Sequence, residues 1–102
     1  MDLSTVNTLY FHIRSNRTGN NLRLRLYNTN TDVWLEYEPI IGVADTWQQE
    51  VWDLSGETGE DKDSIDKIQI LITNDEDANE FYIDNFYYIT LNRRRSIVVA
   101  MA

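Results

Sequence analysis

Residues 21–27 alternate between leucine and basic or aromatic side chains, and this alternation constrains the fold more than any other feature of the chain. The two alternating sets are Leu22, Leu24, Leu26 and Arg23, Arg25, Tyr27. Successive side chains of a β-strand point to opposite faces of the sheet. The pattern therefore predicts a half-buried strand whose leucines face a core and whose other side chains face outward.

The same period of two recurs at residues 8–14, where the sets are Leu9, Phe11, Ile13 and Tyr10, His12, Arg14. Further strands are expected at residues 33–41, 46–54, 65–73 and 80–90, with turn-forming residues between them. Residues 60–67 lack an apolar face and predict a loop or one short helical turn. Six strands at this spacing predict an all-β antiparallel sandwich.

The last of these strands contains an acidic residue between aromatic ones. Strict alternation over residues 81–89 puts Phe81, Ile83, Tyr87 and Ile89 on one face and Tyr82, Asp84, Phe86 and Tyr88 on the other. A carboxylate among aromatic rings is costly when unpaired. Asp84 is therefore expected to meet backbone donors, a cation or a metal ion.

Three segments together resemble the galactose-binding-like, jelly-roll carbohydrate-binding modules. They are Trp47–Ser55, which ends in Asp53-Leu54-Ser55, then Ile65-Asp66-Lys67-Ile68, and finally Phe81-Tyr82-Ile83-Asp84-Asn85. The resemblance covers about residues 5–90. It implies an antiparallel jelly-roll sandwich of about six to seven strands, binding of a glycan or polysaccharide, and a structural calcium ion with Asp84 at the acidic position of the last strand.

The chain departs from that family at both ends. Only Met1–Thr5 precede the first clear strand, where such modules usually have a further strand that helps to hold calcium. Residues 1–92 are expected to form the sandwich, and residues 93–102 form a basic and then apolar tail. We expect the tail to be an extra strand of its own sandwich or a strand exchanged with a neighbour, so that residues 95–101 mediate homo-oligomerisation.

Composition indicates one compact domain and excludes several classes of function. The chain has 102 residues, 42% of them apolar, and no cysteine. Sixteen of its seventeen acidic residues lie between positions 31 and 90, which argues against a nucleic-acid-binding face. No apolar run approaches the ~20 residues that a membrane helix needs. No secretory signal is visible at the start, yet the resemblance leads us to expect an extracellular or surface-exposed protein.

The outward residues of the early strands form the candidate ligand site. Residues 8–14 and 21–27 are expected to pair, which would put His12, Arg23, Arg25 and Tyr27 on one face. Trp34 shares a face with Glu36 and Glu38, so its indole is expected to point outward and complete a stacking platform for a sugar. Guanidinium groups suit uronate or sulfate oxygens, so this cation-rich face is expected to favour an anionic glycan over a neutral one. The alternative is an ordinary solvated surface for the arginines and edge packing for the tryptophan.

The remaining aromatic and acidic clusters are expected to be structural. The resemblance implies a packing role for Trp47, and Trp52 is expected to belong to the core with Leu54. The acidic segment 75–80 lacks the glycine and glutamate of an EF-hand calcium loop, and we interpret it as a solvated hairpin loop.

The leading hypothesis is a non-catalytic carbohydrate-binding module with an accessory or adhesion role. One histidine, no cysteine and no nucleophile or phosphate-loop motif give no basis for an enzyme. The alternative is a structural subunit or decoration protein of a virion, filament or surface layer built on the same fold.

Overall fold

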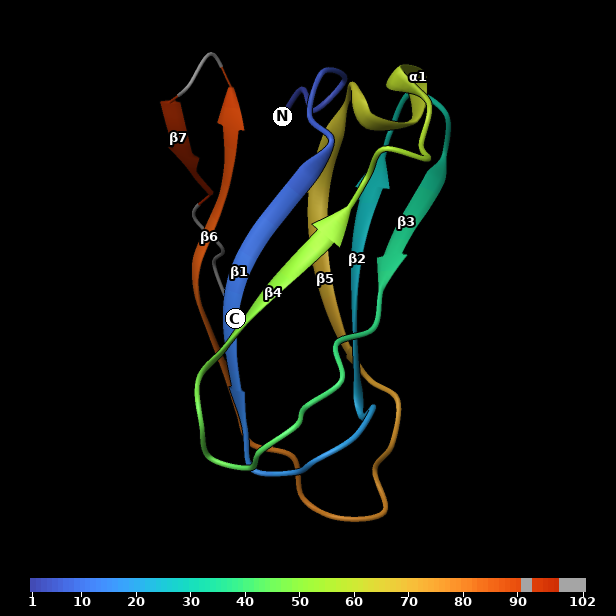
Figure 1. Ribbon diagram of the computed structural model, residues 1–102. Coiled ribbons are helices and arrows are strands. Elements are labelled where there is room, and N and C mark those ends of the chain that lie inside the picture. The colour runs from blue at the N-terminus through green and yellow to red at the C-terminus, as the bar shows by residue number, and fades with distance from the viewer. Residues whose placement is uncertain (91–92, 98–102) are drawn as a thin grey trace.

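The computed structural model describes residues 1–90 and 93–97, and its regular secondary structure is almost entirely β-strand (Figure 1). In chain order the elements are β1 (Thr8–Ser15), β2 (Leu22–Asn28), β3 (Val33–Tyr37), β4 (Gln48–Asp53), α1 (Gly59–Lys62), β5 (Ile65–Ile72), β6 (Phe81–Thr90) and β7 (Arg93–Ser96). The six strands expected from the sequence all form, and the tail supplies a seventh.

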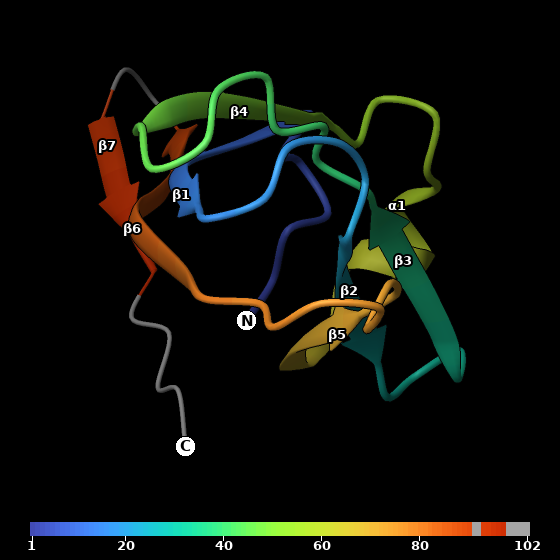
Figure 2. The same cartoon turned by 90° about the horizontal axis from the view of Figure 1, so that it is seen from below.

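Two antiparallel sheets face each other across the core. One has the order β4-β1-β6-β7 and the other the order β3-β2-β5. Viewed from below, the strands of the two sheets lie on opposite sides of the molecule (Figure 2). The predicted all-β antiparallel sandwich is therefore confirmed, whereas the jelly-roll connectivity stays a prediction.

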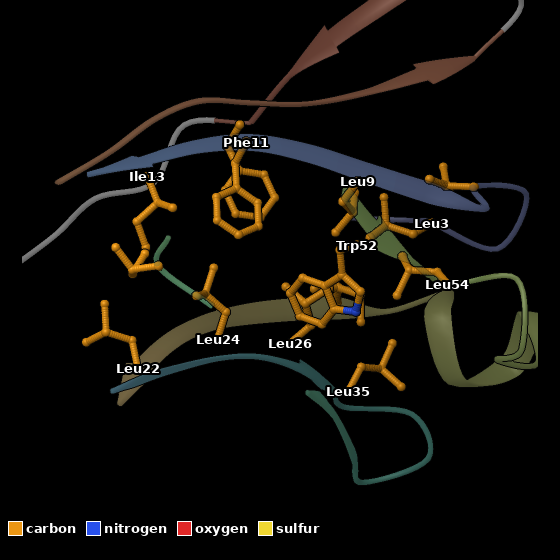
Figure 3. Close-up of a cluster of buried hydrophobic side chains, with 14 residues drawn as sticks. Leu3, Leu9, Phe11, Ile13, Leu22, Leu24, Leu26, Leu35, Trp52 and Leu54 are labelled. Carbon is orange, nitrogen blue, oxygen red and sulfur yellow. The ribbon is translucent and has the colours of Figure 1, made fainter. Parts of the chain in front are cut away.

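The core is built from the inner rows of β1 and β2, as the alternation predicted. Leu9, Phe11 and Ile13 of β1 are fully buried and project toward the other sheet (Figure 3). Leu22, Leu24 and Leu26 meet them from β2 and are at most 1% exposed, while Arg23 and Arg25 lie on the outer face. The burial of these six side chains supplies the main hydrophobic contribution that holds the sheets together.

The prediction that Trp47 and Trp52 both serve packing is half right. Trp52 is 3% exposed and its ring stacks on Tyr37 at 5.5 Å. Trp47 lies in the loop before β4 and keeps 47% of its surface exposed, so the packing role predicted for it is wrong.

Strand β6 does not alternate strictly, because it contains a β-bulge. Tyr10 pairs with Tyr87 and His12 pairs with Asp84, so two residues of β6 stand against the single Phe11 of β1. Asn85 takes up the extra residue in a left-handed conformation with φ of 52°. Phe81 and Ile83 pack against the core before the bulge, and Phe86 and Tyr88 do so after it. The predicted face assignment is therefore wrong beyond Asn85.

The single helical turn α1 buries a lysine. Lys62 is only 3% exposed, and its ammonium group donates hydrogen bonds to the carbonyl oxygens of Val6 at 2.8 Å and Leu54 at 3.4 Å. These bonds link the N-terminal segment to the loop after β4. One short helical turn was one of the two alternatives expected for residues 60–67, but the burial of its lysine was not expected.

The segment before β1 is part of the core rather than a loose end. Leu3 and Val6 are buried, and Leu3 N–H donates to the Lys62 carbonyl at 2.8 Å. The Met1 ammonium donates to the Ile65 carbonyl at 2.8 Å, and Ile65 N–H donates back to Met1 at 2.9 Å. The segment thus covers one end of the sandwich without forming a strand.

At the opposite end, two loops that cross between the sheets are joined by Arg17. Its guanidinium donates to the carbonyl oxygens of Asn74 at 2.7 Å and Asp77 at 3.3 Å, and to the side chain of Asn79 at 3.3 Å. Asn16 adds bonds to the Ala78 carbonyl and the Glu80 N–H. The acidic loop between β5 and β6 is therefore held by the loop between β1 and β2.

The tail begins as an edge strand of its own sandwich. Residues of β7 pair antiparallel with the end of β6, from Thr90 opposite Arg93 to Tyr87 opposite Ser96. Ile97 N–H then donates to the Phe86 carbonyl at 2.6 Å, and Ile97 packs against the core. The strand thus forms at the basic start of the tail, in residues 93–96, whereas most of the apolar segment expected to pair belongs to residues 98–102, which lie outside the described residues.

Candidate functional site

The outer face of the three-stranded sheet carries a cluster of aromatic, charged and amide side chains, which we call the Trp34 platform. It consists of Trp34, Tyr27, Arg23, Arg25, Glu36, Glu38, Lys67 and Gln69. Tyr27 of β2 stands opposite Trp34 of β3 on one side and Lys67 of β5 on the other. The Tyr27 and Trp34 rings lie 4.8 Å apart at 44° to each other. The expectation that Trp34 shares the outer face with charged residues is therefore met.

Two cations cover parts of these rings. The Arg25 guanidinium carbon lies 4.0 Å from the centre of the Trp34 ring, and the Lys67 ammonium lies 5.0 Å from that of Tyr27. Cations are attracted to the negative faces of aromatic rings. One face of the indole is thus already in contact with Arg25, which fixes how the ring can meet a ligand.

The arginines of the platform are paired with carboxylates. Glu38 accepts hydrogen bonds from Arg23, and Glu36 lies 3.2 Å from Arg25 Nε and 3.7 Å from Arg23 Nε. The Arg25–Glu36 contact does not have hydrogen-bond geometry, so we interpret it as an electrostatic contact. Arg25 Nη1 instead donates to Gln69 at 3.2 Å. The face is therefore mixed in charge rather than cation-rich as expected.

These contacts also set the ionisation of Glu38. Hydrogen bonds from Asn20 and then from Arg23 hold the pKa of Glu38 below its ordinary value, so this carboxyl is a carboxylate at neutral pH. The bond to Glu38 likewise raises the pKa of Arg23.

Tyr27 is fixed at its hydroxyl end. It donates a hydrogen bond to Asp32 Oδ1 at 2.5 Å, and this bond raises the pKa of the Tyr27 phenol. Asp32 itself sits in a left-handed conformation with φ of 56° in the turn before β3. The turn thus orients the second ring of the platform.

His12 does not belong to this face. The expectation that residues 8–14 and 21–27 pair is wrong, because β1 and β2 lie in different sheets. His12 lies on the outer face of the four-stranded sheet, and its Nδ1 is 3.4 Å from Asn85 Nδ2. Outer faces of opposite sheets point away from each other, so His12 cannot contact a ligand held by Trp34.

Asp84 is exposed and is not enclosed by aromatic rings, which corrects the expectation from the sequence. One of its oxygens accepts a hydrogen bond from the Asn85 N–H at 2.8 Å. In the described part of the chain no three metal-ligating side chains come together. The calcium ion that the resemblance implies stays a prediction, with Asp84 as its expected ligand.

Sequence reasoning missed Lys67 and Gln69 as members of the platform. The signal was present, because alternation along β5 puts both residues in one row, but their position beside Tyr27 and Arg25 depends on the pairing of β2 with β5. It also missed a stack on the other outer face, where the Tyr10 and Tyr87 rings lie 5.0 Å apart and Arg94 covers Tyr87 at 4.0 Å.

Comparison of the chain with protein-family models, with curated proteins and with solved structures finds no match. Of the helices in residues 1–90 and 93–97, none is both long and apolar enough to cross a membrane.

Proposed function

We propose that this protein is a non-catalytic carbohydrate-binding module that uses the Trp34 platform. The observation that carries the proposal is the outward orientation of Trp34 beside Tyr27, on a face that also carries charged and amide side chains. Proteins bind sugars by packing aromatic rings against their C–H surfaces and by holding the hydroxyls with a few fixed polar groups.

The pairing of charges on this face indicates the kind of glycan. Arg23 and Arg25 already contact Glu36 and Glu38, so a carboxylate already balances the charge of each guanidinium. Neither guanidinium is therefore left to pair with a uronate or sulfate group of a ligand. The carboxylates and Gln69 offer acceptors, and the arginines and Lys67 offer donors. This composition suits the hydroxyls of a neutral glycan better than the anionic glycan expected from the sequence.

The proposal is one of binding without catalysis. Glycoside hydrolysis needs one carboxyl group that stays protonated and can donate its proton. The hydrogen bonds to Glu38 lower its pKa, so this carboxyl is not suited to donate a proton. An accessory or adhesion role at an extracellular or exposed surface follows from such binding.

A glycan array with the full chain tests the proposal, followed by calorimetric titration of any ligand found. Trp34→Ala should weaken binding by at least about tenfold, because an aromatic anchor is lost. Trp47→Ala is the matched control, since Trp47 is also exposed but lies in the loop before β4, outside the three-stranded sheet. Absence of any bound glycan, or equal losses from the two variants, would contradict the proposal.

A structural subunit is the second candidate, and the edge position of β7 favours it. All four residues of β7 are exposed, and an edge strand offers main-chain hydrogen bonds to another chain. A protein that assembles without binding any glycan would support this candidate over the first.

A further inference from the structure

The four-stranded sheet has two edge strands, β4 and β7, with opposite character. Within the described residues, β4 pairs only with β1 and β7 pairs only with β6. We propose that β7 of one copy of this protein adds to β4 of the next, so that the sheet continues from copy to copy. This inference does not depend on whether the Trp34 platform binds a glycan.

The main-chain groups on both edges are directed outward at alternate residues. On β4, Leu54 N–H bonds to Asn7 of the β1 side at 2.7 Å, so Gln49, Val51 and Asp53 direct their N–H and C=O groups away from β1.

On β7, Ile97 N–H bonds to Phe86 at 2.6 Å, so Arg94 and Ser96 direct theirs away from β6. The two edges therefore present complementary rows of unpaired donors and acceptors.

The directions of the strands suit a head-to-tail contact. Each neighbouring pair in the order β4-β1-β6-β7 is antiparallel, so β4 and β7 run in opposite directions. A second copy in the same orientation therefore brings its β4 antiparallel to β7 of the first. The residues whose main-chain groups point away from the sheet edge also have their side chains on the outer face of the sheet, on both strands. Side chains of paired residues would therefore lie on the same face of the continued sheet.

The charges of the two edges favour pairing of β7 with β4 over the two symmetric pairings, β7 with β7 and β4 with β4. β7 carries Arg93, Arg94 and Arg95, whereas β4 carries Glu50 and Asp53 and no basic residue. Pairing β7 with β7 would place six arginines along one seam, and pairing β4 with β4 would bring carboxylates together. Like charges across strands are destabilising and opposite charges are stabilising. The favoured partner of each edge is the other edge of a second copy.

The β4 side also exposes apolar side chains that a partner would cover. Val51 is 52% exposed on the strand, and Ile40, Val43 and Trp47 in the loop before it are 68%, 61% and 47% exposed. The Gln48 side chain ties this loop to β4 by bonds to Ile40 and Gly42. Such a concentration of exposed apolar groups is typical of an interaction surface.

A contact between two different edges is heterologous, and it produces open filaments or closed rings rather than a symmetric dimer. Sedimentation velocity of the full chain over a range of concentrations should therefore show species larger than a dimer. Raising the ionic strength from about 0.05 M to about 0.5 M should weaken association, because salt screens the contact between the arginines and the acidic edge.

Charge reversal provides the decisive test. The variant Arg93→Glu/Arg94→Glu/Arg95→Glu and the variant Gln49→Lys/Asp53→Lys should each associate more weakly than the wild type by at least about tenfold. An equimolar mixture of the two should assemble again, because the reversed β7 then meets the reversed β4. Circular dichroism should show that both variants keep the native sheet content.

A proline at the edge tests the main-chain part of the contact. Val51→Pro removes an N–H that points away from β1 and should block association without loss of the fold, as prolines are tolerated on edge strands. Val51→Thr keeps the N–H and should assemble like the wild type. Three results would each overturn the proposal. The wild type could stay monomeric, the variant with glutamates in β7 could associate more strongly than the wild type, or the mixture of the two charge variants could fail to assemble.

Discussion

The Arg25 guanidinium lies over the Trp34 indole, with 4.0 Å between the guanidinium carbon and the ring centre. The two residues occupy neighbouring strands, and Trp34 is paired with Tyr27 rather than with Arg25. The contact is therefore diagonal across the sheet, at a separation that long and aromatic side chains can span.

A double-mutant cycle should detect this contact as a coupling energy. Arg25→Ala and Trp34→Ala should couple by about 0.5–1 kcal/mol in the free energy of unfolding, as expected for a partly exposed cation–π pair. Urea denaturation of the four proteins provides the measurement. The pair Arg25 and Trp47 is the control and should show no coupling, and a similar value for both pairs would contradict the prediction.

Asn85 should tolerate glycine but not a β-branched residue. Its φ of 52° lies in the left-handed region, which Asn and Gly adopt at low cost. Asn85→Val should lower the free energy of unfolding by about 1–2 kcal/mol, while Asn85→Gly should change it little. If the Asn85→Val variant were as stable as the Asn85→Gly variant, the bulge would not have the conformation described.

Loss of the Lys62 ammonium should destabilise the fold. Lys62→Met keeps an unbranched apolar side chain, one atom shorter, but leaves the Val6 carbonyl without its partner, which should cost about 1–3 kcal/mol. Leu54 loses less, because its carbonyl also accepts a bond from Glu57. Lys67→Met, at the other lysine, should cost under about 1 kcal/mol. A more stable Lys62→Met would mean that burying the ammonium costs more than its two hydrogen bonds contribute.

The bond from Tyr27 to Asp32 should make stability fall at alkaline pH. Its effect is to raise the pKa of Tyr27, so the folded state holds the phenol proton more tightly than the unfolded chain does. The resulting stabilisation is present below about pH 10, the ordinary pKa of tyrosine, and is lost as the pH rises through the folded pKa.

Asp32→Asn should lower the pKa of Tyr27, because it removes the carboxylate, while asparagine keeps the left-handed turn. Carbon NMR of ζ-labelled tyrosine measures the titration directly. Tyr82 is the internal reference, since its own pKa is raised by a bond to Glu80 and should not change. If the pKa of Tyr27 did not change in this variant, the bond to Asp32 would not be what raises it.

The faces of the strands could be predicted from the sequence because alternation is a local property. Leu24 and Arg25 must point in opposite directions in any sheet, and Trp34 follows the same rule. Which strands pair is not local, and this is why His12 was assigned to the wrong face. Nothing in the alternation of residues 8–14 indicates that β1 joins β4 and β6 while β2 joins β3 and β5.

Single residues account for the other differences between the predictions from the sequence and the structure. The extra residue at Asn85 reverses the alternation of β6, and the aromatic and aliphatic residues on both sides of Asp84-Asn85 give no sign of it. Lysine is rarely buried, so its position in α1 argued for solvent exposure. Only the carbonyl groups of Val6 and Leu54, distant in sequence, make the buried ammonium acceptable.

The bonds from Arg17 to the chain between β5 and β6 limit how this end of the protein can change. Surface loops usually accept insertions and deletions without regard to one another. Here a shorter β5–β6 loop would move the carbonyl groups of Asn74 and Asp77 out of reach, and the Arg17 guanidinium in the neighbouring loop would lose these hydrogen-bond acceptors. Variation in length between β5 and β6 should therefore be accompanied by replacement of Arg17, so the two loops should evolve as a unit.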